Sequence, residues 1–140
     1  MSPKQLIIIR NSWYFISNIN EGIFGKFFYE RLNIIAPEMR SVFQESLPYS
    51  SKKMMTMIGY AVRNIEHPEE IGYTFSHLAS RYGIYVVKSL KYAVANAFLW
   101  ALEQSLGGLW TDDIEDAWAA FYTAALEYII PVTDRQQIAA

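Results

Sequence analysis

The sequence predicts an all-α protein, and three observations lead to this fold class. The periodic apolar segments repeat at intervals of three and four residues, which is the spacing of one face of an α-helix. No stretch alternates apolar and polar residues as a half-buried strand would. The five prolines all fall where a predicted helix begins or ends. We therefore expect about seven to eight helices and no β-sheet.

The first helix is predicted to begin with a capping box at Ser2-Pro3-Lys4-Gln5, in which Ser2 caps the helix and proline occupies its first position. It should end near Asn18. A second helix should follow and stop at Pro37, because a proline disfavours helical backbone in the residue before it. Its apolar residues at helical spacing are Ile23, Phe24, Phe27, Phe28, Ile34 and Ile35.

The middle of the chain contains the clearest amphipathic pattern. Residues 37–43 are interpreted as one short helix, and residues 44–49 as a loop. A helix should then start at Ser50 or Ser51, either of which can act as its N-cap. The apolar positions that match its inner face are Met54, Met57, Ile58, Ala61, Val62 and Ile65.

Residues 71–82 form a shorter helical pattern that Gly83 should end. Ile71, Phe75, Leu78 and Tyr82 lie on one face of this predicted helix, at spacings of four, three and four. The histidine of the segment, His77, lies on the other face. A pocket beside the apolar face would therefore contact Tyr82 and not His77.

Two long helices are predicted in the last part of the chain. Residues 88–106 are apolar nearly all round and should end at Gly107-Gly108. The final helix should begin at Asp112, with Glu115 reaching back to the cap, and should end at Pro131. This gives a domain at 1–131 and a C-terminal tail at 132–140. Because aromatic residues lie on several faces, we expect a homo-oligomer formed through the 88–106 and 112–130 helices.

Composition restricts the possible functions. At 140 residues the chain has the size of one domain, and it contains no cysteine, which excludes disulfides and thiolate chemistry. The net charge of −2 comes from scattered charges, so no nucleic-acid partner is indicated. The longest apolar run, 92–102, is too short to predict a membrane span. The N-terminal residues lack the pattern of a signal peptide, and we expect a cytoplasmic protein.

Several segments, taken in order, carry a resemblance to a known family. These segments are Phe28-Tyr29-Glu30-Arg31-Leu32, Pro37-Glu38, Phe43, residues 53–58, Ala61-Val62, residues 99–107, Trp110-Thr111 and Ala117-Trp118. Together they resemble the bacterial single-domain globins, a haemoglobin-like family, along almost the whole chain. The predicted helix order also resembles that of a globin: two long helices, a short turn helix, an amphipathic helix, a shorter helix and two long helices. The resemblance implies a globin fold.

The resemblance also implies the positions of a haem pocket. Phe43 would wedge against the haem, Tyr29 would point into the distal pocket, Met54 and Leu78 would pack on the ring, and Ser50 would occupy the distal glutamine position. Tyr82 would occupy the position of the proximal histidine that ligates the iron, so the proximal histidine is replaced by tyrosine. An alternative alignment, shifted by one residue, places Arg81 there. Neither alignment supplies a histidine.

Two interpretations of Tyr82 follow. As a metal ligand, its tyrosinate would bind ferric iron, a known form of haem ligation that requires the phenol to ionise well below its usual pKa of about 10. Otherwise Tyr82 fills a pocket that holds no iron, since buried tyrosines are common. His77 would become a ligand only if the helix rotated by about a third of a turn.

The other candidate groups have simpler explanations. Four carboxylates at 112, 113, 115 and 116 could bind a divalent cation, but a helix N-terminus favours negative charge in any case. The serines lack a histidine and acid partner, so hydrolase chemistry is not supported. We expect a non-enzymatic sensing, interaction or structural subunit that is free of haem. The alternative is a haem-binding globin that takes up oxygen, nitric oxide or another small ligand with Tyr82 as axial ligand.

Overall fold

The computed structural model describes residues 1–19, 21–39, 51–67, 69–70 and 91–139, and within these ranges the secondary structure is helical with no strand. The elements are α1 (Pro3–Ile19), α2 (Glu21–Ile35), η1 (Pro37–Met39), α4 (Ser51–Arg63), α7 (Ala93–Leu106), η2 (Gly107–Leu109) and α8 (Asp112–Ala139). The all-α prediction is therefore confirmed over this part of the chain. No helix searched here is long and apolar enough to cross a membrane.

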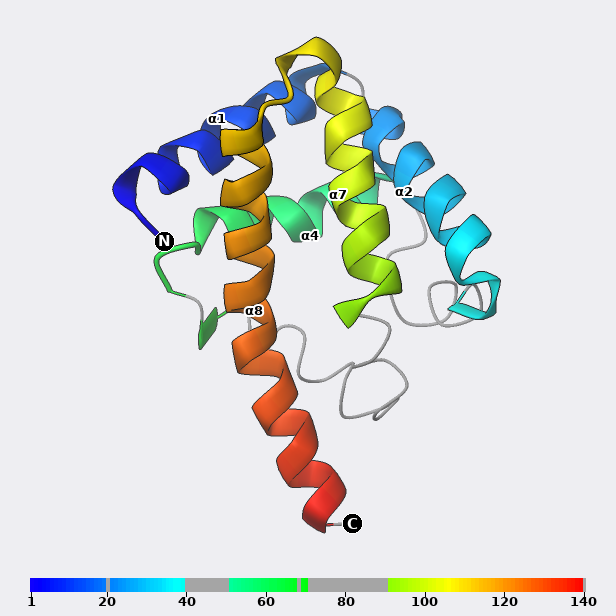
Figure 1. Cartoon of the computed structure of the whole chain (residues 1–140), viewed down its shortest axis with the longest axis vertical. Helices are drawn as coiled ribbons and strands as arrows, with labels where there is room; N and C mark the ends of the chain where they lie inside the picture. The colour runs from blue at the N-terminus through cyan, green and yellow to red at the C-terminus, as the bar shows by residue number, and fades with distance from the viewer. Residues whose placement is uncertain (20, 40–50, 68, 71–90, 140) are drawn as a thin grey trace.

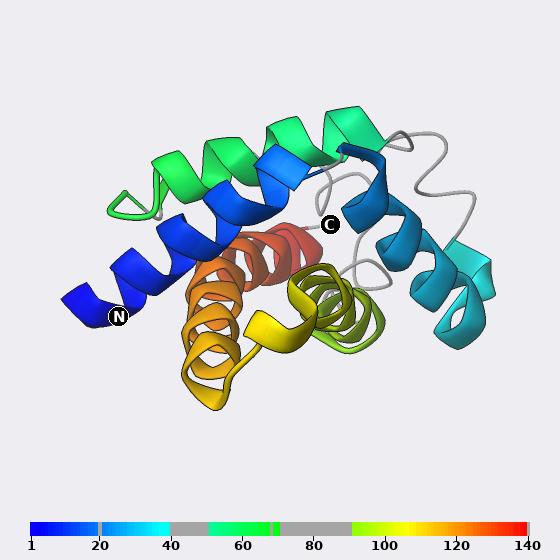
Figure 2. The same cartoon turned by 90° about the horizontal axis from the view of Figure 1, so that it is seen from above.

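The helices pack in two groups that share one core. Helix α2 lies along α7 and also contacts α4, while α1 packs against α8 and α4 (Figure 1). Viewed from above, α1 and α4 run side by side over the pair α7 and α8 (Figure 2). Helix α7 is thus covered by α2, α1 and α8, and this position explains why its sequence is apolar on several faces.

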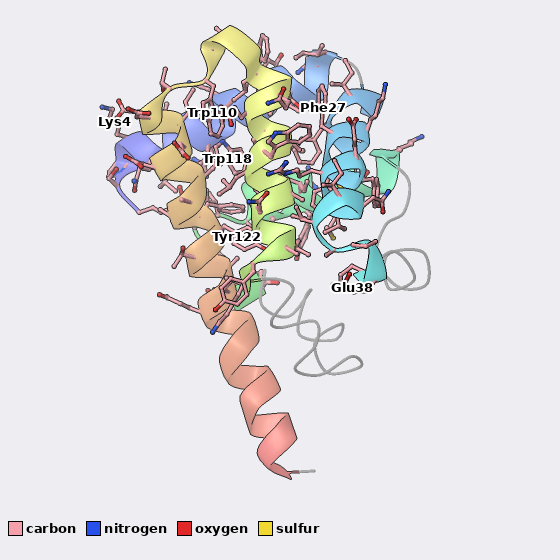
Figure 3. The ribbon with its side chains drawn as sticks, turned by 45° about the vertical axis from the view of Figure 1, so that its right-hand side comes forward. Lys4, Phe27, Glu38, Trp110, Trp118 and Tyr122 are labelled. Atoms are coloured by element: carbon pink, nitrogen blue, oxygen red, sulfur yellow. The ribbon has the colours of Figure 1, made fainter. Side chains whose placement is uncertain are left out.

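Aromatic side chains from four helices form the centre of the core. Trp118 of α8 is fully buried where α8 faces α7, and its ring meets Trp13 edge to face at 6.2 Å and Phe98 at 5.7 Å (Figure 3). Phe24 of α2 contacts Trp13 at 5.6 Å and Phe98 at 5.8 Å. The indole N–H of Trp118 donates a hydrogen bond of 2.9 Å to the Ser12 hydroxyl, so its buried polar atom is satisfied.

The start of α1 confirms the predicted capping box. The backbone N–H of Gln5 donates to Ser2 Oγ at 3.2 Å, and the backbone N–H of Ser2 donates to Gln5 Oε1 at 3.0 Å. This reciprocal pair satisfies backbone donors that the first helical turn leaves without partners. The helix ends at Ile19, one residue beyond the predicted end.

The start of α8 corrects the predicted cap. The hydroxyl of Thr111 accepts the backbone N–H of Ile114 at 3.2 Å, so Thr111 is the N-cap and Asp112 is the first helical residue. Glu115 therefore does not reach back to a cap at Asp112. Its carboxylate instead lies in the first turn with Asp113, where negative charge is favoured by the helix dipole.

The end of α8 differs from the sequence prediction as well. The prediction that Pro131 ends this helix is wrong, because α8 continues to Ala139 (Figure 1). A proline lacks the N–H that would reach the carbonyl four residues earlier, but the residues after it, with no glycine and two glutamines, are compatible with a helix. The tail predicted at 132–140 is thus helical up to residue 139.

The other boundaries and faces agree with the sequence in most places. Helix α7 begins at Ala93, later than the predicted residue 88, and ends at Gly107, whose φ of +55° suits a glycine. At the end of α2, Ile34 is 68% exposed and Ile35 is 37% exposed, whereas Leu32 and Ala36 are buried, so the last two isoleucines of the apolar pattern lie outside the core. On α4, Met55 is buried whereas Met57 is only half-buried.

Candidate functional site

Two of the six predicted pocket residues lie in the part of the chain that the structure describes. These are Tyr29 on α2 and Met54 on α4, and the two helices pack against each other. The other four, Phe43, Ser50, Leu78 and Tyr82, lie outside the described residues, as does His77. The candidate site is therefore considered from Tyr29 and Met54, on the contacting helices α2 and α4.

Tyr29 places a phenol in an apolar environment. Its side chain is half-buried, and its ring packs edge to face against Phe28 at 5.4 Å. Burial raises the pKa of Tyr29 to about 12, because an ionised phenolate loses solvation there. Near neutral pH the side chain is a neutral hydroxyl, which donates one hydrogen bond and accepts others. It would contribute a polar group without a charge to a pocket beside α2.

Met54 forms part of the apolar surface of α4. Its side chain is only 2% exposed and belongs to the core cluster that includes Ile58 and Leu32. A buried methionine packs with many neighbours because its unbranched chain adapts to irregular gaps. Met54 is thus suited to lie against the flat face of an apolar ligand or against other core side chains.

A cluster on the seam between α2 and α7 holds the Tyr29 helix in place, and sequence reasoning did not identify it. The Arg31 guanidinium lies 5.6 Å from the ring centroid of Trp100, within cation–π range, and its Nε donates to Asn96 Oδ1 at 3.1 Å. Phe27 packs edge to face on Trp100 at 5.7 Å (Figure 3). Phe27 and Arg31 are four residues apart, a spacing that puts them on one face, but only the fold brings Trp100 opposite them.

The described residues contain one histidine, and it does not lie in the core. His67, the one histidine among them, is exposed in the turn after α4, and its Nδ1 lies 3.6 Å from Glu69 Oε1. In the same residues no group of three histidine, cysteine or acidic side chains could hold a metal ion. Met54 lies in the core of the described residues, and Tyr29 packs against that core from the neighbouring helix.

Comparison with known protein families gives no match: no family model matches this chain. The resemblance to bacterial globins thus depends on the segments quoted above and on the helix order. The described elements are two long helices, a short turn helix, α4 and two C-terminal helices, and the shorter helix predicted at residues 71–82 lies outside the described residues.

Proposed function

We propose that this chain is a globin-like protein with an altered tetrapyrrole pocket, acting in the cytoplasm as a non-enzymatic sensing, interaction or structural subunit and free of haem. The observation that supports it best is the packing of α2 against both α4 and α7, with Tyr29 and Met54 on the two neighbouring helices. In the resemblance Tyr29 would point into the distal pocket and Met54 would pack on the ring. An apolar pocket of this kind binds apolar molecules by burial of area alone.

The chemistry of the pocket favours this proposal over oxygen transport. Tyr82 takes the position of the proximal histidine in the resemblance, and a phenol binds iron well only after it loses its proton. Tyr29 stays neutral in its apolar site and is unsuited as an anionic ligand. His67 is unsuited as a pocket ligand because its side chain is exposed to solvent. Haem would therefore lack the neutral imidazole that normally holds it.

An absorption spectrum tests the proposal directly. We expect protein purified from haem-supplied cells to lack a stoichiometric Soret band, because no histidine lies on the apolar face predicted for residues 71–82. The ratio of haem to protein concentration gives the number of haem groups per chain. A sharp Soret band at one haem per chain would contradict the proposal and favour the alternative, a haem-binding globin with Tyr82 as axial ligand.

Two variants separate the possible ligands if haem is taken up. Tyr82→Phe should abolish a tyrosinate-to-iron charge-transfer band, because phenylalanine has no oxygen to bind the metal. His77→Ala should leave the spectrum unchanged. The reverse result would show that the helix phase assigned to residues 71–82 is wrong.

We also propose that the chain self-associates through α7 and α8. Most of the apolar side chains that led to this expectation, among them Phe98, Leu102 and Trp118, are buried within the protein, and the exposed apolar residues that remain there are Tyr92 before α7 (73% exposed) and Leu109 after it (52% exposed). Large apolar side chains on the surface favour an interface, which in a symmetric dimer would meet its own copy. Sedimentation at micromolar concentration should give a dimer, and Tyr92→Glu should shift it to the monomer. A monomeric parent protein, or a dimer that is indifferent to this charge, would contradict the proposal.

A further inference from the structure

A hollow lies between α1 and α4, which run side by side (Figure 2). It is an open groove of about 480 Å³. Neither Tyr29 nor Met54 lines it. The residues that matter for its chemistry are Arg10 and Trp13 from α1 and Lys52, Met55, Gly59 and Arg63 from α4.

Gly59 lies in the lining of the groove beside Trp13 and Arg63. A Cβ on Gly59 would lie 3.6 Å from Trp13 Nε1 and 3.5 Å from an Arg63 guanidinium nitrogen. The indole edge of Trp13 and the guanidinium of Arg63 thus border the same space. Trp13 is 6% exposed and Met55 is 9% exposed, so both belong to the core and offer only one surface to the groove.

The indole N–H of Trp13 is a donor directed at this space. The corresponding N–H of Trp118 is bonded to Ser12, whereas within the described ranges Trp13 Nε1 has no hydrogen-bond partner. Among the described residues, the buried side-chain atom without a partner is Ser105 Oγ, so Trp13 Nε1 is a donor that solvent reaches in the groove. The groove therefore contains a hydrogen-bond donor that a bound molecule can use.

The charges around the groove all have one sign. Arg10, Lys52 and Arg63 line it, and none of its lining residues is acidic. Arg10 is 3.2 Å from Glu66, but over the described part of the chain neither Lys52 nor Arg63 forms an ion pair. Because Glu66 neutralises Arg10, the cations left for a ligand are Lys52 and Arg63, and two cations beside an apolar floor favour a ligand that is apolar and carries a negative charge.

We propose that the groove between α1 and α4 binds a small organic anion with a flat apolar body and one carboxylate. The body would lie on Trp13 and Met55 beside Gly59, and the carboxylate would meet the cations, with Arg63 and the Trp13 N–H as its nearest donors. The volume falls in the range of small-molecule sites. This inference does not depend on the proposed tetrapyrrole pocket.

The experiment compares two probes that share an apolar body. Naphthalene-2-carboxylate carries the charge, and naphthalene-2-carboxamide is its neutral counterpart. Proton–nitrogen correlation spectra resolve the indole N–H signals of the four tryptophans, and Trp13→Phe assigns the signal of interest. We expect the carboxylate to move the Trp13 signal, with the Trp118 signal unchanged, and to bind about tenfold more tightly than the amide.

Charge variants test the cations individually. Arg63→Gln should weaken carboxylate binding about tenfold and leave amide binding unchanged, since a charge-assisted hydrogen bond is lost. Lys52→Gln provides a second variant with a smaller loss, and both side chains are exposed or at the rim, so the fold should persist. Lys26→Gln on α2, outside the groove, is the matched control and should change nothing.

Four results would overturn the inference. The first two are absence of any binding at millimolar probe and equal affinity of the protein for the two probes. The other two are movement of the Trp118 signal in place of the Trp13 signal, and unchanged affinity of Arg63→Gln for the carboxylate. Raising the salt concentration should weaken the carboxylate more than the amide, because exposed charges are screened.

Discussion

Replacing Trp118 with alanine should remove about 3 to 5 kcal/mol of stability, which is much of the 5 to 15 kcal/mol, roughly, that a domain of this size possesses. The side chain is fully buried, and it contacts Trp13, Phe98 and Phe121 with ring centroids 6.2, 5.7 and 5.5 Å away. Its removal leaves a cavity where α1, α7 and α8 meet. The surrounding aromatic rings are rigid and cannot collapse into such a space.

Urea unfolding followed by circular dichroism measures this loss. Trp118→Phe should cost less, since it keeps most of the buried area and removes the 2.9 Å hydrogen bond to Ser12, whose hydroxyl still donates to the Ile8 carbonyl at 2.7 Å. Tyr14→Ala is the control, because Tyr14 is 72% exposed and surface changes stay within about 0.5 kcal/mol. Equal losses for Trp118→Ala and Tyr14→Ala would contradict the description of the core.

Helix boundaries could be predicted where the chain carries a complete local signal. Ser2 and Gln5 form both halves of a capping box, and the structure has it. At α8 the acidic run offered Asp112 as a cap, but Thr111 one residue earlier fills the role, since both residue types cap well and the sequence does not choose between them. Pro131 predicted the end of the last helix, but α8 continues past it to Ala139.

The candidate site was harder to predict because it depends on which faces meet. The periodicity of α4 identified Met54 as an inner residue, and it is. It did not show that α4 also borders α1 with a row of cations. Arg10 and Trp13 are three residues apart on α1, and Lys52 and Met55 are three apart on α4, so each row is visible at helical spacing. Only the packing of the two helices places one row opposite the other.

The free energy of unfolding should decrease above pH 10, and Tyr122 should cause most of this decrease. Its ring packs on Phe98 at 5.7 Å between α7 and α8, and burial raises the pKa of the phenol above its ordinary value of about 10 (Figure 3). The pKa of Tyr29 is raised to about 12 for the same reason. Both side chains are partly buried, so solvent screening reduces the contribution of each, and the smaller rise in pKa makes that of Tyr29 the smaller one.

Below pH 10 the phenols of Tyr29 and Tyr122 are neutral in both the folded and the unfolded chain. Their contribution to the free energy of unfolding should therefore not change with pH in this range. Above pH 10 the unfolded chain ionises first, and the stability that Tyr122 contributes is lost at about 1.4 kcal/mol per pH unit until the folded protein also ionises. Urea unfolding at pH 8, 10, 11 and 12 measures this slope. Tyr122→Phe should reduce the loss in the free energy of unfolding between pH 10 and pH 12 by about 2 to 3 kcal/mol. Tyr14→Phe, at an exposed position, should leave this loss unchanged. Parallel curves for the parent protein and Tyr122→Phe would show that this phenol ionises freely in the folded state.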